Sequence, residues 1–191
     1  MQSVEQSFEE LRQRLKQRHT LAHVSDDPVF YLVFRPKEIL DVKRLLGKWE
    51  AKLRLDDWVV HYFSMANAIK EIFSNNSLRA LWLSSEKEAP LDFEEINKTL
   101  ADALIANDTL KDKLDEKLQS LSGHHNAVLF ITDLEALHPY LRVGSLEQKL
   151  QGRFTVPTVI LYPGRRGGKT TLSFLGIYPE DGNYRSIHIG G

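Results

Sequence analysis

The sequence contains no cysteine. This absence excludes disulfide bonds, a thiolate nucleophile, and any zinc site or iron–sulfur cluster that needs thiolate ligands. Long hydrophobic runs are missing as well: no stretch approaches the roughly 18 apolar residues of a membrane-spanning helix. The first 19 residues also lack the apolar core of a secretion signal. We therefore expect a cytoplasmic protein that does not enter a membrane.

An excess of one charge sign is also absent. The 191 residues include 25 Lys and Arg against 26 Asp and Glu, a net charge of −1. The surface as a whole therefore does not attract DNA or an acidic membrane, although a local basic patch is compatible with this charge. Hydrophobic residues make up 42% and charged residues 27%, which is typical of a globular chain. Without repeats or low-complexity linkers, the length fits a single domain over residues 1–191.

Apolar periodicity predicts an α/β fold. Runs rich in β-branched and aromatic residues predict four core strands, over residues 28–34, 57–64, 127–133 and 156–163. Apolar residues at helical spacing predict helices over 4–18 and 37–55, and Pro36 suits the start of the second helix. The order strand–helix–strand between residues 28 and 64 predicts that its two strands are parallel.

Residues 65–122 are predicted to form a helical segment within this domain, because their apolar residues keep a helical period. Asp92 and Thr109 are expected to cap two of its helices, and residues 84–90 are expected to form a loop. The last helix places four leucines on one face: Leu110, Leu114, Leu118 and Leu121. Apolar spacing of this kind, in this helix and in those before it from about residue 70, is typical both of a face on the domain's own core and of a groove for a partner. Whether these helices are a binding platform therefore stays open.

The C-terminal part of the chain predicts two further strands, over residues 170–178 and 184–190. Both partly alternate apolar and polar residues, as half-covered antiparallel strands do. Asp181, Gly182 and Asn183 form a turn sequence between them. The complete pattern predicts a three-layer α/β domain with a mostly parallel central sheet, antiparallel C-terminal strands and a helical insertion in the middle.

A glycine-rich stretch, GRRGGKT over residues 164–170, resembles a phosphate-binding P-loop. A P-loop has four residues between its two outer glycines, whereas three separate Gly164 from Gly168. The P-loop lysine also opens a helix, but the residues after Lys169 alternate like a strand and soon reach Pro179. We therefore expect a hairpin-like connection here rather than a working nucleotide site.

The same stretch and the last strand carry the candidate binding residues. Arg165, Arg166 and Lys169 form a small group of cations that suits a phosphate or an acidic partner. Tyr184 and Arg185 stand at the start of the last strand. The alternative for residues 164–170 is a soluble turn whose glycines supply the unusual backbone angles and whose charges have no binding role.

No further motif points to catalysis or to a bound metal. HxH, HExxH and GxSxG are absent, so we expect no catalytic residue, metal or cofactor. Asp133 ends a core strand, where α/β folds often place functional side chains, but capping of the following helix is the simpler role. Trp49, Trp58 and Trp82 lie in apolar periodic segments and are expected in the core.

The C-terminal third of the chain resembles a known family. LHPYLRVGSLEQKLQGRFTVPTVILYPG and FLGIYPEDGNYRSIHIGG are similar to the BrxB family of BREX phage-resistance systems, long catalogued as a domain of unknown function. The resemblance is specific over residues 127–191, looser through FYLVFRP…LL and weak over 65–121. It implies a small cytoplasmic accessory protein without assigned catalytic residues. Its implied partners are a PglZ-like protein and, in the same system, an AAA-type ATPase and an adenine methyltransferase.

Three functional hypotheses follow. The favoured one is a non-catalytic adaptor that binds the PglZ-like protein and helps to assemble the defence complex. A nucleic-acid contact protein would instead place Arg165, Arg166, Lys169 and Arg185 against phosphates, alone or within the complex. A degenerate nucleotide-binding protein would use residues 164–170.

Overall fold

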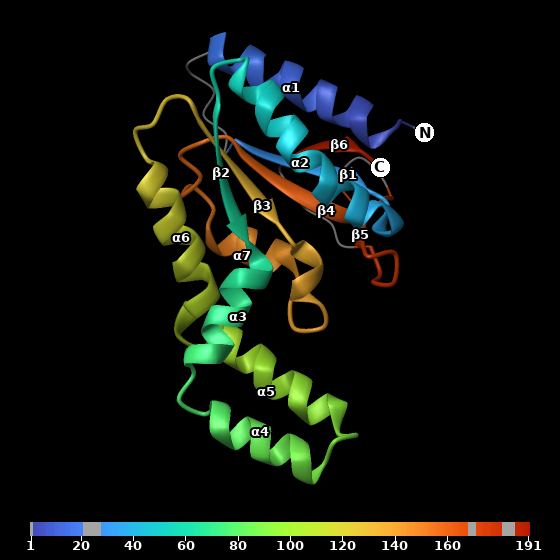
Figure 1. Cartoon of the computed structure of the whole chain (residues 1–191), viewed down its shortest axis with the longest axis vertical. Helices are drawn as coiled ribbons and strands as arrows, with labels where there is room; N and C mark the ends of the chain where they lie inside the picture. The colour runs from blue at the N-terminus through green and yellow to red at the C-terminus, as the bar shows by residue number, and fades with distance from the viewer. Residues whose placement is uncertain (1, 21–27, 168–170, 181–185) are drawn as a thin grey trace.

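The computed structural model describes residues 2–20, 28–167, 171–180 and 186–191, and its fold is α/β (Figure 1). The elements, with η for a 3-10 helix, are α1 (Val4–Thr20), β1 (Val29–Phe34), η1 (Pro36–Glu38), α2 (Ile39–Arg54), β2 (Val59–Ser64), α3 (Met65–Asn75), α4 (Arg79–Glu88), α5 (Phe93–Ile105), η2 (Ala106–Asp108), α6 (Thr109–Leu121), β3 (Ala127–Thr132), η3 (Leu134–Leu137), α7 (Val143–Lys149), β4 (Thr158–Arg166), β5 (Leu172–Phe174) and β6 (Ile187–Gly190). The four predicted core strands and the two predicted N-terminal helices are confirmed.

In the described part of the chain, five strands form a parallel sheet in the order β2–β3–β4–β1–β6. β1 and β2 run in the same direction, as predicted, but β3 and β4 lie between them. β6 pairs with β1 in parallel, with His188 opposite Tyr31, so the prediction of an antiparallel last strand is wrong. Alternation misleads here because an edge strand is half-covered whatever its direction.

The antiparallel strand is β5, which pairs with the end of β4. The glycine-rich stretch therefore joins two antiparallel strands, and the hairpin-like connection is confirmed. Gly164 is needed in this pair, because a side chain there would collide with the carbonyl of Ser173 and the ring of Tyr162. Residues 168–170 and 181–185 lie outside the described residues, and with them Lys169 and the expected turn at 181–183.

Helices cover both faces of the sheet, so the three-layer prediction is confirmed. α1 and α2 pack on one face, and α3, α6 and α7 pack on the other (Figure 1). β1 and β3 are buried along their whole length. Because alternate residues of a strand point to opposite faces, Phe30 and Leu32 enter the first layer's core while Tyr31 and Val33 enter the second.

Two of the three tryptophans lie in the core, as predicted. Trp49 stacks on Phe8 of α1, with ring centroids 4.6 Å apart, and Trp58 is also buried. Trp82 is different: it is half-buried in α4, edge-on to Phe73 of α3 at 6.1 Å. The prediction of a core position is wrong for Trp82, because α4 has no buried residue and contacts the rest of the chain only lightly.

The helical segment over residues 65–122 contains helices of two kinds. The four leucines of α6, Leu110, Leu114, Leu118 and Leu121, are all buried, so this face belongs to the domain's own core. α4 is exposed instead, and it includes residues 84–88. The predicted loop over 84–90 is therefore wrong for most of its length, because Glu and Lys, which dominate it, are good helix formers.

One of the two predicted caps is confirmed. The Asp92 carboxylate accepts a hydrogen bond from the Glu95 N–H at the start of α5, at 3.3 Å. Thr109 is not a cap: it is the first residue of α6, and its hydroxyl donates to the carbonyl of Ala106. The residue before it, Asp108, has a left-handed backbone with φ of 56°, which turns the chain sharply between α5 and α6.

Candidate functional site

The carboxyl ends of β2 and β3 carry a polar cluster centred on Asp133. Its carboxylate accepts hydrogen bonds from Ser64 at 2.6 Å and from Thr132 at 2.9 Å. Lys43 of α2 places its Nζ 2.7 Å from Asp133 and 2.6 Å from Glu135. The predicted role of the Asp133 side chain as a helix cap is wrong, since it makes no cap hydrogen bond to η3 and is turned into this cluster.

In this cluster one lysine is shared by two carboxylates, and the opposite charges stabilise one another. Burial opposes ionisation of Asp133, but hydrogen bonds from Lys43, Ser64 and Thr132 outweigh it and lower the pKa of this carboxyl. Burial likewise disfavours the charged form of Lys43, but its two carboxylate partners raise the pKa of the amine. Both oxygens of Asp133 already have donors, whereas a general base needs an oxygen within reach of its substrate. The cluster is typical of salt bridges that hold α2 against the carboxyl ends of the strands.

The two hairpin arginines lie at the outer end of β4, and both are exposed. Successive residues of a strand point to opposite faces. Arg166 therefore shares the face of Tyr162, in the core that α3, α6 and α7 cover, and Arg165 shares the face of Leu161, on the side of α1 and α2. Arg166 also lies near His188, whose imidazole it affects electrostatically. The structure thus separates these arginines across the sheet.

Three of the predicted binding residues, Lys169, Tyr184 and Arg185, lie outside the described residues. A shared site for all five residues therefore stays a prediction. Arg165 and Arg166 lie at the carboxyl edge of the sheet, the edge where open α/β sheets place their binding groups, but on opposite faces of it.

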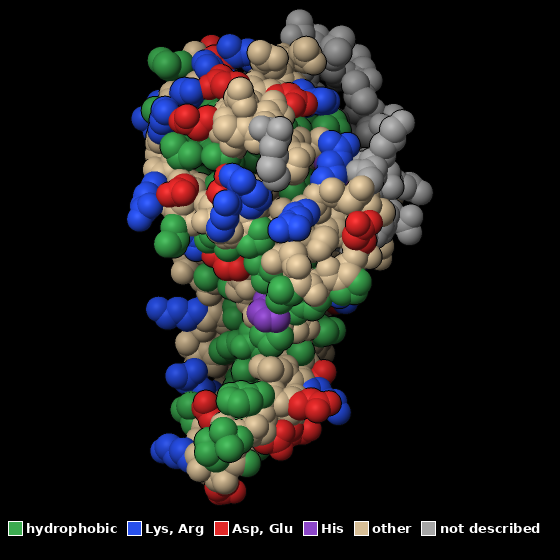
Figure 2. All heavy atoms as spheres, turned by 90° about the vertical axis from the view of Figure 1, so that its right-hand side faces the viewer, with side chains coloured by type: hydrophobic (Ala, Val, Ile, Leu, Met, Phe, Trp, Pro, Cys, Tyr) green, Lys and Arg blue, Asp and Glu red, His purple; other side chains and the backbone are tan. Residues whose placement is uncertain are grey.

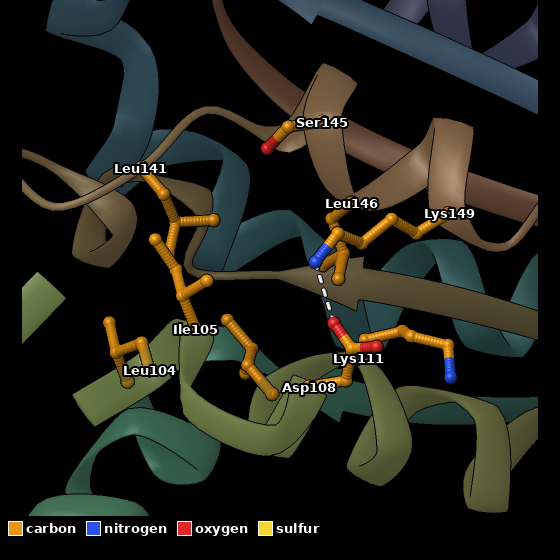
Figure 3. Close-up of a pocket in the computed structure, with 9 residues that line it drawn as sticks. Leu104, Ile105, Asp108, Lys111, Leu141, Ser145, Leu146 and Lys149 are labelled. Atoms are coloured by element: carbon orange, nitrogen blue, oxygen red, sulfur yellow. Dashed lines mark hydrogen bonds and ion pairs between the residues drawn. The ribbon is translucent and has the colours of Figure 1, made fainter. Parts of the chain in front are cut away.

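A small pocket lies between α5, α6 and α7 (Figure 3). Leu104, Leu110 and Leu146 are among its apolar lining residues, and the ion pair between Lys149 and Asp108, at 2.6 Å, spans it. Its free volume of about 30 Å³ has room for one or two water molecules. A nucleotide does not fit in this pocket.

The described residues do not bring metal-ligating side chains together. Across residues 2–20, 28–167, 171–180 and 186–191, no group of three His, Asp or Glu has the arrangement of a metal site. His138 contacts the hydroxyl of Tyr178, while the ring of His124 lies 3.3 Å from the Leu121 carbonyl. None of the described helices has both the length and the apolar character needed to cross a bilayer.

Helices α4 and α5 form an arm that projects away from the sheet layers (Figure 1). The apolar stripe of α5 is covered only at the base of the arm: Leu104 is 1% exposed, but Phe93, at the other end of the helix, is 63% exposed. α4 is anchored by Trp82, which lies edge-on to Phe73, and Phe73 in turn lies edge-on to Tyr140 at 5.6 Å. This chain of aromatic contacts thus links α4, which has no buried residue, to α3 and to Tyr140.

The arm leaves a group of large apolar side chains uncovered. Six of the twelve exposed large hydrophobic residues in the described chain come from residues 78–105: Leu78, Leu81, Leu83, Leu91, Phe93 and Ile105. Figure 2 shows hydrophobic side chains on the surface of this lower part of the molecule, with acidic side chains on one side of them and basic ones on the other. Single exposed apolar residues are ordinary, but a group of them on one projecting element is a feature typical of interaction surfaces.

Sequence reasoning left open whether the helices from about residue 70 to 121 bind a partner, but it did not single out this surface, although a signal was present. The stretch LRALWL over residues 78–83 is apolar at five of six positions if alanine is counted. A helix cannot direct so many apolar residues toward one core, because its apolar stripe covers only part of its circumference. An excess of this kind indicates a second apolar face.

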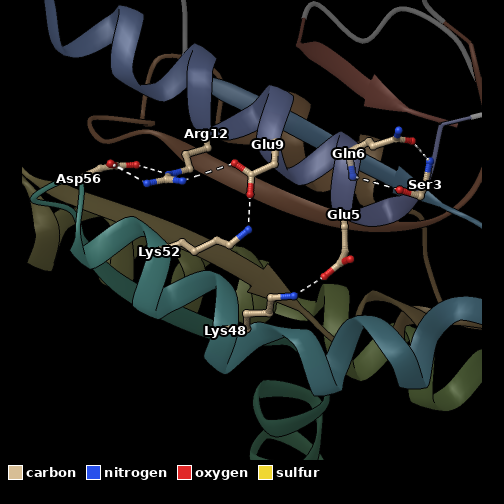
Figure 4. Close-up of polar contacts among 8 residues, drawn as sticks. All are labelled: Ser3, Glu5, Gln6, Glu9, Arg12, Lys48, Lys52 and Asp56. Carbon is tan, nitrogen blue, oxygen red and sulfur yellow. Dashed lines mark hydrogen bonds and ion pairs between the residues drawn. The ribbon is translucent and has the colours of Figure 1, made fainter.

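Charges on the opposite end of the molecule are paired within the chain (Figure 4). Along the seam between α1 and α2, Lys48 lies 2.5 Å from Glu5, and Lys52 pairs with Glu9. At the end of the seam the Arg12 guanidinium donates two hydrogen bonds to Asp56, and this pairing lowers the pKa of the Asp56 carboxyl. These charges hold two helices together.

Comparison with known proteins identifies one family. The model of a family described as BREX protein BrxB matches residues 61–189, about two thirds of the chain. No curated protein and no solved structure matches the chain. The matched region extends from β2 to β6, so it includes the arm, the polar cluster and the hairpin. It also includes the helical segment over residues 65–121, where the resemblance read from the sequence is weak.

Proposed function

We propose that this chain, which belongs to the BrxB family and is thereby a component of a BREX phage-defence system, acts as a non-catalytic adaptor that binds a PglZ-like protein. In this proposal the adaptor works in the cytoplasm, and the AAA-type ATPase and the methyltransferase of the system join through the complex that it helps to assemble.

The observation that carries this proposal is the arm. α4 has no buried residue, and α5 buries only Leu104, so the two helices expose apolar surface that the chain's own core does not cover. Burial of such apolar surface is favourable by about 25 cal/mol for each Å² that is removed from contact with water. A helix pair that contributes only Leu104 as a buried residue of the core is well suited to bind a second protein.

The arrangement of the polar groups also supports a binding role over catalysis. The carboxyl ends of the parallel strands are the usual place for an active site, and here Asp133 is occupied by Lys43, Ser64 and Thr132. The neighbouring carboxylate, Glu135, shares the same lysine.

The proposal is tested by co-expression with the PglZ-like protein of the same BREX system in a host that lacks the system. We expect a complex that survives affinity purification and elutes as one peak from size exclusion at micromolar concentration. Light scattering on that peak gives the stoichiometry. Separate elution of the two proteins at this concentration would reject the adaptor role.

A second candidate function, contact with nucleic acid, is favoured by the exposed Arg165 and Arg166 at the carboxyl edge of the sheet. Phosphate contacts release counterions, so binding should weaken steeply as salt is raised. Fluorescence anisotropy with duplex DNA at low and moderate salt tests this. If the chain and its complex do not bind DNA at low salt, or bind it without salt dependence, this candidate is excluded.

A further inference from the structure

The arm ends in a tip, residues 86–95, which joins α4 to α5. We infer that this tip is the docking element of the adaptor, and that it inserts Leu91 and Phe93 into an apolar cleft bordered by Lys and Arg side chains on the PglZ-like protein. This inference rests on the proposed function, which leaves the binding surface and its chemistry open.

The apolar part of the tip consists of two prominent side chains. Leu91 is 83% exposed and Phe93 is 63% exposed, and Leu91 is the most exposed large hydrophobic residue of the described chain. Asp92 stands between them and accepts a hydrogen bond from the Glu95 N–H, which fixes the first turn of α5. Phe93 is therefore presented by an ordered helix start, so little conformational entropy is lost when it is buried.

The charge of the tip is strongly one-sided. Residues 86–95 contain five carboxylates and one lysine, a net charge of −4 in a chain whose total is −1. Within the described residues, none of these five carboxylates has an ion-pair partner, whereas the acidic groups along the seam of α1 and α2 are paired with lysine or arginine. The five are Glu86, Glu88, Asp92, Glu94 and Glu95.

Charge complementarity selects the occupant. Unpaired carboxylates surround the apolar side chains of the tip, so its complement is an apolar cleft with a cationic rim. A cleft with an anionic rim is disfavoured, because like charges brought together at an interface cost several kcal/mol. Two tips of this chain would repel each other, which argues against a tip-to-tip dimer. The phosphates of a nucleic acid would be repelled as well. The occupant that satisfies both features is a protein with a basic border around an apolar cleft.

The absence of cysteine allows a direct test of burial. In Leu91→Cys the introduced thiol is the only one in the chain, so an environment-sensitive dye attached to it reports on the tip alone. The matched control is Leu40→Cys on α2, where the native side chain is 64% exposed. On addition of the purified PglZ-like protein, we expect a blue-shifted emission and protection from an aqueous quencher at position 91, and no change at position 40.

Two substitution sets test the chemistry of the contact by titration calorimetry. Phe93→Ala should weaken binding by roughly 30-fold, the effect of losing an aromatic hot spot, whereas Leu40→Ala should leave it unchanged. Replacing Glu86, Glu88, Glu94 and Glu95 together by Gln should weaken binding by roughly tenfold at low salt and remove most of its salt dependence. Its control is Glu116→Gln, an exposed carboxylate on α6.

The outcomes separate this inference from the proposed function. If the wild-type chain does not bind the PglZ-like protein at all, the proposed function fails. If it binds, and the dye at position 91 stays exposed while Phe93→Ala binds as tightly as wild type, the tip inference is wrong and the adaptor role survives. If the dye becomes protected with rising concentration of the chain alone, the occupant is a second copy, and the inference is likewise overturned.

Discussion

The stability of this protein is expected to fall as the pH is lowered from 7 toward 4, and the buried His188 is one cause of this. His188 lies on β6 and is 8% exposed, with its ring edge-on to that of Tyr31 at 5.5 Å. Burial, and then the nearby cation of Arg166, lowers the pKa of this imidazole from 6.5 to about 4. The folded state therefore favours the neutral form of the His188 imidazole.

The sign and the size of the effect follow from proton linkage. Below pH 6.5 the unfolded chain binds a proton at His188, while the folded chain does not until about pH 4, so acid favours unfolding across this window. Each unit of pKa difference is worth about 1.4 kcal/mol. Between pH 7 and pH 5 this group should therefore remove about 2 kcal/mol from the free energy of unfolding, a large part of the stability of a typical domain.

Urea unfolding followed by the fluorescence of the buried Trp49 and Trp58 measures this effect at pH 7 and at pH 5. His188→Gln should change the free energy of unfolding less between these two pH values than wild type does, by about 2 kcal/mol. His125→Gln, which removes an exposed imidazole, is the control for the loss of one histidine. If wild type and His188→Gln show the same pH dependence, the burial of His188 is not what limits stability in acid.

Three further predictions follow from the described contacts. Arg12→Ala should lower the free energy of unfolding by about 1–3 kcal/mol, because Asp56, whose side chain is 7% exposed, loses two hydrogen bonds. Urea unfolding measures this change, and an unchanged free energy of unfolding would contradict the structural role of the seam. Trp82→Ala should speed amide hydrogen exchange in α4 while global stability stays close to wild type, since α4 has no buried residue; unchanged exchange would show that Trp82 does not anchor the arm. Wild-type protein titrated with ATP and Mg²⁺ should give no binding heat, because antiparallel strands flank the glycine-rich stretch; heat that Lys169→Ala abolishes would restore the nucleotide hypothesis.

The parts of this protein that the sequence predicted are those in which local periodicity and burial coincide. Residues 127–132 are apolar at nearly every position and form a strand buried on both faces, because only the centre of a parallel sheet accepts such a run. The leucines of α6 repeat at helical spacing and all reach the core. The hairpin-like connection after β4 was predicted from the alternation of apolar and polar residues beyond residue 170, a pattern that gives a strand, but not a helix, one apolar face.

Other features depend on contacts between distant segments, and only the tertiary structure decided them. The neighbour and direction of β6 are set by β1, more than 150 residues earlier in the chain. The role of Asp133 is set by Lys43 and Ser64, which come from α2 and β2. Leu91 and Phe93 are exposed because the arm carries them away from the sheet layers. Periodicity indicates which side chains can be buried together, but only the packing of the segments determines which surface covers them. On the arm, Leu104 is covered in this way, whereas Leu91 and Phe93 stay exposed.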